Sequence, residues 1–240
     1  MHDWLTARPI AHRGLHDVAA GVVENTASAF RAAIDASYGI ECDLQISADG
    51  EAMVHHDDAL GRLTDGAGRL DTISAEALKR VAFKATADRM LTLGELCDLV
   101  AGRATLVIEL KGFGRDKRLA ERTAKMLAGY GGPAAVMSFD PGLIADVRTL
   151  APSLARGLVV MRRDAGSPTA NVSAAHYIRQ ALAARPRFLA CRVQDLTSTA
   201  PLLARNVLRM PLLTWTVRTP AERVRAGYYA DQMIFEGFRP

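Results

Sequence analysis

Short apolar runs alternate with amphipathic stretches along most of the chain, and this alternation restricts the possible folds more than any other feature. The apolar runs have the length of β-strands and lie at residues 9–13, 40–46, 105–111, 134–139, 156–160, 187–193, 211–217 and 231–235. Helical patterns follow most of them, at residues 25–37, 92–102, 117–129, 141–150, 172–184 and 198–206, with a last helix opened by Thr219 and Pro220. About eight strands separated by helices predict an α/β protein with a TIM (β/α)8 barrel.

One connection departs from this regular pattern. Residues 57–91 separate the second predicted strand region from its helix, and this connection is far longer than the usual strand-to-helix loop. The segment carries turn signals in TDGAGRL and a short amphipathic stretch in SAEALKRVAF. We therefore predict a single TIM-barrel domain over residues 1–240, with a small inserted segment at about 57–91.

Composition narrows the possible partners and compartments. The formal net charge is only +4, and without a basic arm or a block of like charges we expect no nucleic-acid partner. Three scattered cysteines, none in a C-x-x-C pair, are typical of a reducing compartment. The N-terminus shows no signal-peptide pattern, and no apolar run is long enough to cross a bilayer. We expect a cytoplasmic protein without stable membrane insertion, and the oligomeric state stays open.

Acidic residues occupy two predicted strands at positions where a buried strand normally carries an apolar side chain. Because side chains alternate across a strand, Glu41 and Asp43 share one face of the second strand, and Glu109 and Lys111 share one face of the third. An exposed edge strand could explain the first pair, and a surface ion pair could explain the second. In a closed parallel barrel, however, both faces are covered, and a buried carboxylate needs a partner, a proton or a metal. We expect the three acids to meet at the C-terminal mouth of the barrel and to suit one divalent cation, Mg²⁺ or Ca²⁺, with Mn²⁺ also possible.

Basic residues are predicted at the same mouth. His12 and Arg13 end the first strand, and His56 lies in EAMVHHD, which we interpret as a short strand returning to the mouth. Two histidines can supply a general base and a general acid, while Arg13 and Lys111 can neutralise phosphate oxygens. Together with three metal-binding acids, this set indicates phosphodiester chemistry on a small-molecule substrate. We assign no chemistry to the other histidines, His2, His16, His55 and His176.

These residues also carry a resemblance to a known family. The segments HRG at 12–14, ENT followed by AF at 24–30, IECDLQISADGEAMVHHDDALGRLT at 40–64 and IELK at 108–111 resemble the glycerophosphodiester phosphodiesterase family in order and spacing. A late TWTV extends the likeness more weakly toward the C-terminus. The resemblance implies a TIM barrel with an insertion after the second strand, and metal-dependent hydrolysis of glycerophosphodiesters to sn-glycerol 3-phosphate and an alcohol.

The resemblance also implies roles for individual residues. By this likeness the catalytic acid–base pair is His12 and His56, the cation ligands are Glu41, Asp43 and Glu109, the phosphate contacts are Arg13 and Lys111, and Trp215 lines the pocket. One departure concerns the C-terminus, where the family commonly has a Thr-Asp pair followed by proline and this chain reads IFEGFRP. Glu236 then takes the place of the acid as a possible pocket residue, which leaves the preferred alcohol group open.

Two other functions remain open at this point. A lysophospholipase D acting on lysophospholipids would need an apolar channel or a membrane-facing patch, and the inserted segment is mostly polar. A non-catalytic barrel that binds phosphate ligands is less compatible, since every histidine and acid that the reaction needs is present. Nothing in the sequence indicates which histidine is the base and which is the acid.

Overall fold

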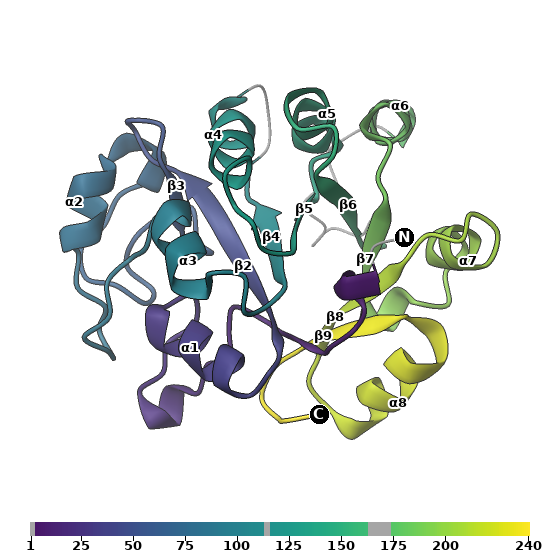
Figure 1. Ribbon diagram of the computed structural model, residues 1–240, viewed down its shortest axis with the longest axis horizontal. Coiled ribbons are helices and arrows are strands. Elements are labelled where there is room, and N and C mark those ends of the chain that lie inside the picture. The colour runs from purple at the N-terminus through teal and green to yellow at the C-terminus, as the bar shows by residue number, and fades with distance from the viewer. Residues whose placement is uncertain (1–2, 113–115, 163–173) are drawn as a thin grey trace.

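Eight parallel strands close into a barrel in the computed structural model, which describes residues 3–112, 116–162 and 174–240 (Figure 1). Each strand pairs with its neighbours in chain order, and β1 closes the ring by pairing with both β2 and β9. The predicted TIM barrel is therefore confirmed. The strands of the ring are β1 (Ile10–Ala11), β2 (Gly39–Ile46), β4 (Leu106–Leu110), β5 (Ala134–Ser138), β6 (Ala155–Val160), β7 (Phe188–Arg192), β8 (Leu212–Val217) and β9 (Gln232–Phe235).

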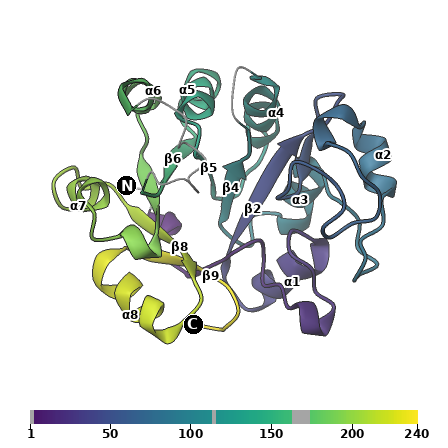
Figure 2. The same ribbon diagram turned by 180° about the vertical axis from the view of Figure 1, so that it is seen from behind.

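Helices surround the ring, as Figures 1 and 2 show from opposite sides. Several begin at the capping signals that the sequence predicts: Thr92 and Thr219 each form a reciprocal capping box with the glutamate three residues on. The first helix begins two residues later than predicted, at Ala27, because the side chain of Thr26 caps it by accepting a hydrogen bond from the Ala29 amide. The helices are α1 (Ala27–Asp35), α2 (Ala75–Arg80), α3 (Leu93–Val100), α4 (Arg118–Leu127), α5 (Pro141–Leu150), α6 (Ala174–Ala184), α7 (Thr199–Asn206) and α8 (Pro220–Tyr229).

The inside of the barrel has an apolar floor. The floor residues come from the early positions of the strands, and they are Ile10, Val107, Ala135, Ala155, Phe188, Leu213 and Ile234. Phe188 is almost fully buried, and a Cβ at position 157 would lie only 2.4 Å from its ring, so glycine is required there. Burying one such aromatic side chain contributes roughly 1.5–3 kcal/mol. This floor leaves the later strand positions to form the polar mouth.

The predicted insertion follows the second strand, as expected. A short strand, β3 (Ala52–Val54), first returns antiparallel to β2, and the chain then makes a small lobe that contains α2. The lobe has its own core, in which Leu70, Leu78, Phe83 and Met90 are buried against Met53 of β3. Because the returning strand ends at Val54, the chain that follows it brings His56 to the mouth of the barrel.

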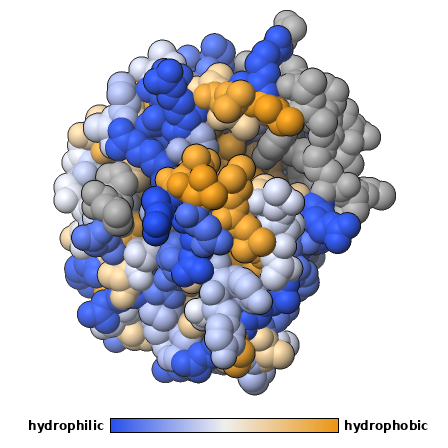
Figure 3. Space-filling model, turned by 90° about the vertical axis from the view of Figure 1, so that its right-hand side faces the viewer, coloured by the Kyte–Doolittle hydropathy of each residue, from blue (hydrophilic) through white to orange (hydrophobic). Residues whose placement is uncertain are grey.

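The outer surface of the helix ring carries apolar side chains at several places. Figure 3 faces the side of the barrel formed by α6, α7 and α8, and apolar side chains gather there among polar ones. The exposed large apolar residues of α6 and α7 include Ile178, Leu182 and Leu203. Among the described residues, no helix combines the length and the apolar character needed to cross a membrane.

Candidate active site

Three buried carboxylates meet inside the barrel mouth. Glu41 and Asp43 project from β2 and Glu109 from β4, and the strand register pairs Asp43 directly with Glu109. All three residues are at least nine-tenths buried, and one carboxylate oxygen from each lies within 4.8 Å of the others. The structure thus brings together the three acids that the strand alternation predicts on one face. They form a group that can hold a divalent cation.

Two cations lie against this acidic group. The Lys111 Nζ atom is 3.0 Å from Asp43 Oδ1 and 2.7 Å from Glu109 Oε1, and the Arg13 Nε atom is 3.3 Å from Asp43 Oδ2. Burial disfavours the charged form of Asp43, but Lys111 and Arg13 outweigh it and lower the pKa of this carboxyl well below its usual range. Burial also opposes the charge on Lys111, yet Asp43 and Glu109 raise the pKa of its ammonium group. Both cations are therefore fixed where a phosphate could reach them.

The balance of charge in the group favours an added cation. Three carboxylates face two basic side chains, and burial followed by the repulsion of Asp43 and Glu109 raises the pKa of Glu41 well above its usual value. Burial likewise raises the pKa of Glu109. Clustered carboxylate oxygens are the ligands that Mg²⁺ and Ca²⁺ prefer. The residues present therefore fit a hard divalent ion, whose charge would favour the ionised form of all three acids.

Two neighbouring residues support the group, and sequence reasoning missed their roles. Asn25 is buried and donates from Nδ2 to Asp43 Oδ2 at 2.9 Å, while its Oδ1 accepts from the Asp43 amide at 3.3 Å. Glu24 accepts a hydrogen bond of 2.7 Å from Arg13 Nη1 and binds Arg62 from the insertion. The position of ENT before a helix favoured a capping role, which concealed these contacts with the site.

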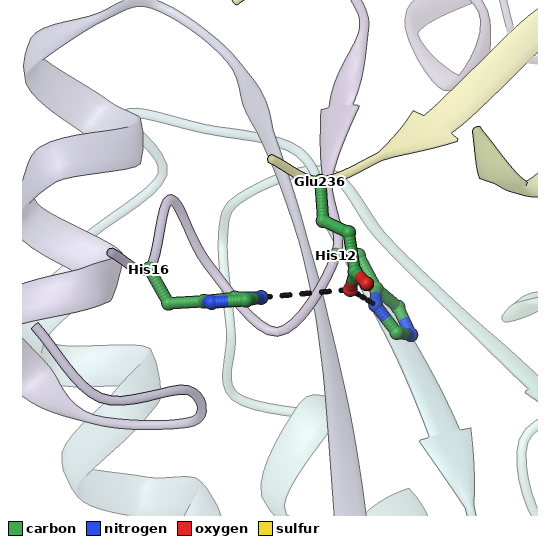
Figure 4. A group of neighbouring side chains, drawn as sticks. All are labelled: His12, His16 and Glu236. Carbon is green, nitrogen blue, oxygen red and sulfur yellow. Dashed lines mark hydrogen bonds and ion pairs between the residues drawn. The ribbon is translucent and has the colours of Figure 1, made fainter. Parts of the chain in front are cut away.

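His12 is oriented by the acid at the end of the last strand. Its Nδ1 atom is 2.5 Å from Glu236 Oε2 (Figure 4). Its Nε2 atom lies 3.9 Å from Glu41 Oε2 of the acidic group. The residues are 224 positions apart, but β1 and β9 are neighbours and Ala11 pairs with Phe235. Burial lowers the pKa of His12, and the hydrogen bond to Glu236 offsets only part of this effect. A neutral His12 can donate from Nδ1 to Glu236 and keep a free lone pair on Nε2.

Glu236 has two further basic neighbours. The His16 Nε2 atom is 3.5 Å from Glu236 Oε2, and Arg218 Nε donates to Glu236 Oε1 at 2.5 Å. Burial favours the neutral form of Glu236, but the basic side chains of His12, His16 and Arg218 outweigh it and lower the pKa of Glu236 well below the usual range. His16, to which the sequence assigned no chemistry, therefore belongs to this cluster (Figure 4). His2 and the side chain of His176 lie outside the described residues.

His56 reaches the same cavity from the returning strand. Its Nδ1 atom is 2.8 Å from Asp57 Oδ1, and its backbone carbonyl accepts a hydrogen bond from Gln45 Nε2 at 2.9 Å. Burial lowers the pKa of His56, and the pKa of Asp57 is lowered to about 2 by hydrogen bonds from Arg62 and His56 that outweigh its own burial. His55 points elsewhere: it is buried with its ring 6.4 Å from that of Phe83.

An open cavity joins these groups at the C-terminal ends of the strands. It measures about 1090 Å³, and His12, Arg13, His56, Glu109 and Lys111 contribute to its wall. The opposite wall is more apolar. It contains Phe139, Met161 and Trp215, with Arg192 and Arg218 near them.

Trp215 lines this cavity from β8. Its indole packs edge-on against Phe139, with ring centroids 5.5 Å apart, and its Nε1 donates to the Ala190 carbonyl at 3.0 Å. These contacts fix the ring beside the space that a substrate can occupy. Trp215 thus lies in the wall of the cavity that holds the two histidines.

The fold and the site define the class of protein: a TIM barrel with an acidic, cation-competent mouth and two carboxylate-bound histidines. A model of the glycerophosphoryl diester phosphodiesterase family matches residues 12–237, so the chain belongs to this family.

Curated relatives agree with this membership. The chain is 33% identical over 161 residues to a glycerophosphodiester phosphodiesterase of Caldanaerobacter subterraneus, covering 62% of this chain and 65% of the relative. It is 42% identical over 74 residues to glycerophosphodiester phosphodiesterase 1 of Bos taurus, covering 30% of this chain and 21% of that one. The chain thus spans less than two thirds of the length of these curated relatives.

Among solved structures, the fold is similar to an Oleispira antarctica phosphodiesterase in complex with the product sn-glycerol-3-phosphate. The TM-score is 0.79 at 20% identity, covering 97% of this chain and 94% of that one. A glycerophosphodiester phosphodiesterase from Thermotoga maritima gives a TM-score of 0.73 at 23% identity, covering 94% and 92% of the two chains. These likenesses concern the barrel as a whole.

Proposed function

We propose that this protein hydrolyses glycerophosphodiesters to sn-glycerol 3-phosphate and an alcohol, using a divalent cation and two histidines. The observation that carries the proposal is that His12, His56 and Glu109 line one cavity, and that Glu41 and Asp43 lie with Glu109 in one acidic group. Family membership and relatives named glycerophosphodiester phosphodiesterases support the reaction. The free, buried cysteines Cys42, Cys97 and Cys191 suit the reducing cytoplasm, where we place the enzyme.

Glu41, Asp43 and Glu109 would hold the cation. We expect Mg²⁺ or Ca²⁺, with Mn²⁺ also possible, because the donor set consists of carboxylate oxygens only. When bound, such an ion polarises a non-bridging phosphate oxygen and stabilises the negative charge that develops on it. Asn25 keeps Asp43 in place by accepting from its backbone amide and donating to its side chain.

Arg13 and Lys111 would bind the phosphate. Both line the cavity, and both are held in position by carboxylates, Arg13 by Glu24 and Lys111 by Glu109. Arg can contact two phosphate oxygens at once through its planar guanidinium, whereas Lys acts as a single point charge. Their charges favour a dianionic transition state over the monoanionic diester, which is the condition for faster reaction.

His12 and His56 would move the protons. Each has its Nδ1 atom within hydrogen-bonding distance of a carboxylate, Glu236 for His12 and Asp57 for His56, so each can present Nε2 to the substrate. The histidine that acts as base accepts a proton on Nε2 from the nucleophile, which is water or the neighbouring glycerol hydroxyl. The other donates its Nε2 proton to the leaving oxygen. The carboxylate behind each ring stabilises the imidazolium form.

The apolar wall supports an alcohol group that is partly non-polar. Phe139, Met161 and Trp215 line the cavity opposite the acids, and these side chains could equally contact the acyl chain of a lysophospholipid. This wall, together with the exposed apolar residues of α6 and α7, keeps a lysophospholipase D activity as the second candidate.

A substrate panel separates these activities. The purified protein is given glycerophosphocholine, glycerophosphoethanolamine and a micellar lysophosphatidylcholine, and the phosphate product is identified by mass spectrometry. The proposal predicts sn-glycerol 3-phosphate as the main product, with the soluble diesters hydrolysed faster. Release of lysophosphatidic acid alone would favour the lysolipid activity. Tight binding of the diesters without turnover would point to a non-catalytic phosphate-binding barrel.

A further inference from the structure

A second group of side chains that could hold a metal ion lies beside the acidic group, with His12 Nε2 3.9 Å from Glu41 Oε2. His12, His16 and Glu236 each offer one ligand atom, and these atoms all lie within 4.8 Å of one another (Figure 4). His16 comes from the loop after β1, and Glu236 follows β9. None of these side chains is more than a fifth exposed.

The Nε2 atom of His16 has no hydrogen-bond partner among the described residues. This atom is buried and makes no well-formed hydrogen bond, although Glu236 Oε2 lies 3.5 Å away. Buried polar atoms without a partner are rare in folded proteins, and each one calls for a physical reason. An ion between His16 and Glu236 would accept the lone pair of Nε2 and supply that partner.

The donor set selects the class of ion. Two imidazole nitrogens and one carboxylate oxygen suit Zn²⁺ and related transition-metal ions, whereas Mg²⁺ and Ca²⁺ prefer oxygen ligands. Tetrahedral zinc with bonds of about 2.0–2.1 Å separates its ligand atoms by roughly 3.3 Å. The separation of His16 Nε2 and Glu236 Oε2 is already 3.5 Å, while that of His12 Nδ1 and Glu236 Oε2 must open from 2.5 Å. The opening is less than 1 Å and fits a side-chain adjustment.

We propose that His12, His16 and Glu236 form a regulatory site for a transition-metal ion, and that an ion bound there stops the reaction. To bind the ion, Nδ1 of His12 must give up the proton that it shares with Glu236. The neutral ring then carries its proton on Nε2 and has no lone pair there to act as a base. It is also a far weaker acid than an imidazolium, so His12 is lost in either role. The displaced proton is taken up at Nε2 through solvent, so the ring stays neutral and binding the ion to His12 releases no net proton.

Zinc binding and zinc inhibition can be measured separately. Zinc bound per chain is determined by equilibrium dialysis in excess Mg²⁺, which keeps the carboxylate group of Glu41, Asp43 and Glu109 filled. Glycerophosphodiester hydrolysis is then titrated with Zn²⁺ under the same conditions. His16→Gln removes one ligand outside the proposed reaction. His55→Gln is the matched control, because His55 is a buried histidine that packs against Phe83 instead. Each variant is compared with its own zinc-free rate.

The proposal predicts one zinc ion per chain in wild type and in His55→Gln. Removing even an outer partner of a metal ligand lowers metal affinity by roughly 10–100-fold, so His16→Gln should weaken zinc binding and inhibition by at least 10-fold. Equal zinc binding by wild type and His16→Gln would overturn the site. The inhibition rests on the proposed function, but the binding does not. A protein that binds zinc through His16 and hydrolyses no diester would therefore refute the function and leave the site standing.

Discussion

The two halves of the barrel differ in the kind of residue that they bring to the mouth. The half made of β1, β2 and β4 supplies the acids, the cations Arg13 and Lys111, and His12, and the insertion beside it adds His56. The half made of β5, β6 and β8 supplies Phe139, Met161 and Trp215. We infer that the first half performs the chemistry and the second half selects the alcohol group. Substitutions in the two halves should therefore change different kinetic constants.

The largest effects are expected from the two histidines of the first half. His12→Ala and His56→Ala should each lower kcat by at least ~10²-fold, the usual contribution of general acid–base groups. The measurement is steady-state hydrolysis of glycerophosphocholine by variants whose folding is checked by circular dichroism. His55→Gln is the control, since it changes the neighbouring histidine outside the cavity. Near-normal kcat in either alanine variant would remove that histidine from the proposed mechanism.

Glu41→Gln should separate cation binding from folding. Burial and the repulsion of neighbouring acids raise the pKa of Glu41 and so favour its neutral form. The neutral glutamine side chain of the variant should therefore not destabilise the cation-free protein. An ion at 100 times its Kd stabilises the wild type by about 2.7 kcal/mol, and this gain should be lost in the variant. Thermal unfolding with EDTA and with Mg²⁺ or Ca²⁺ measures both effects. Glu51→Gln is the control variant, because Glu51 pairs with Arg122 away from the acidic group. It should keep the full stabilisation by the ion. An equal gain in Glu41→Gln would exclude Glu41 as a ligand.

Glu236→Gln tests whether the end of β9 acts on the first half. The uncharged glutamine side chain cannot stabilise the imidazolium form of His12, so kcat should fall by roughly 10–100-fold. This is the range seen when a carboxylate that is hydrogen-bonded to a metal-bound imidazole is removed. The KM should change less than kcat, because Glu236 contacts His12 directly and reaches the side of the alcohol wall only through Arg218. Glu236→Asp keeps the charge and should recover part of kcat. A change in KM alone would show that Glu236 belongs to the binding surface instead.

The pH dependence can tell the two histidines apart. Burial lowers the pKa values of both His12 and His56 below 6.5, and the base must be unprotonated. The kcat/KM value should therefore fall as the pH drops through a midpoint below 6.5. Because Glu236 raises the pKa of His12, Glu236→Gln should move this midpoint to lower pH if His12 is the base. An unchanged midpoint would assign the base to His56, and a wild-type midpoint above 6.5 would contradict the effect of burial.

The smallest effect is expected in the second half. Trp215→Ala should raise the KM for a diester with a bulky alcohol and leave kcat within about 3-fold, since Trp215 offers an apolar contact and moves no proton in the proposed reaction. Trp215→Phe keeps an aromatic ring against Phe139 and should show a smaller change. If Trp215→Ala lowered kcat as strongly as His12→Ala, the division between the two halves would be wrong.

The sequence was sufficient to predict the barrel and the placement of its acids. Alternation along β2 and β4 puts Glu41, Asp43 and Glu109 inside, and the parallel register then aligns Asp43 with Glu109. The insertion was also predictable, because its length exceeds any ordinary connection. These features depend on local periodicity, which a single sequence contains.

The missed features depend on loops and on distant segments. The first strand was predicted to extend to Arg13, but Arg13 and Gly14 turn the chain with φ values of 56° and 80°. A Cβ at Gly14 would lie 2.9 Å from Ala29, so this turn requires glycine and fixes the course of the loop that carries His16. The pairing of His12 with Glu236 depends on closure of the barrel between β1 and β9. No local pattern contains that contact.

The most direct test of the proposed reaction is release of sn-glycerol 3-phosphate from glycerophosphocholine and glycerophosphoethanolamine. The protein is assayed in EDTA and then with Mg²⁺, Ca²⁺ or Mn²⁺ restored. We predict no release in EDTA and recovery with at least one of these ions, because the acidic group should bind the substrate phosphate through the cation. Full activity in EDTA, or no release with any of the ions, would contradict cation-dependent phosphodiester hydrolysis at this site.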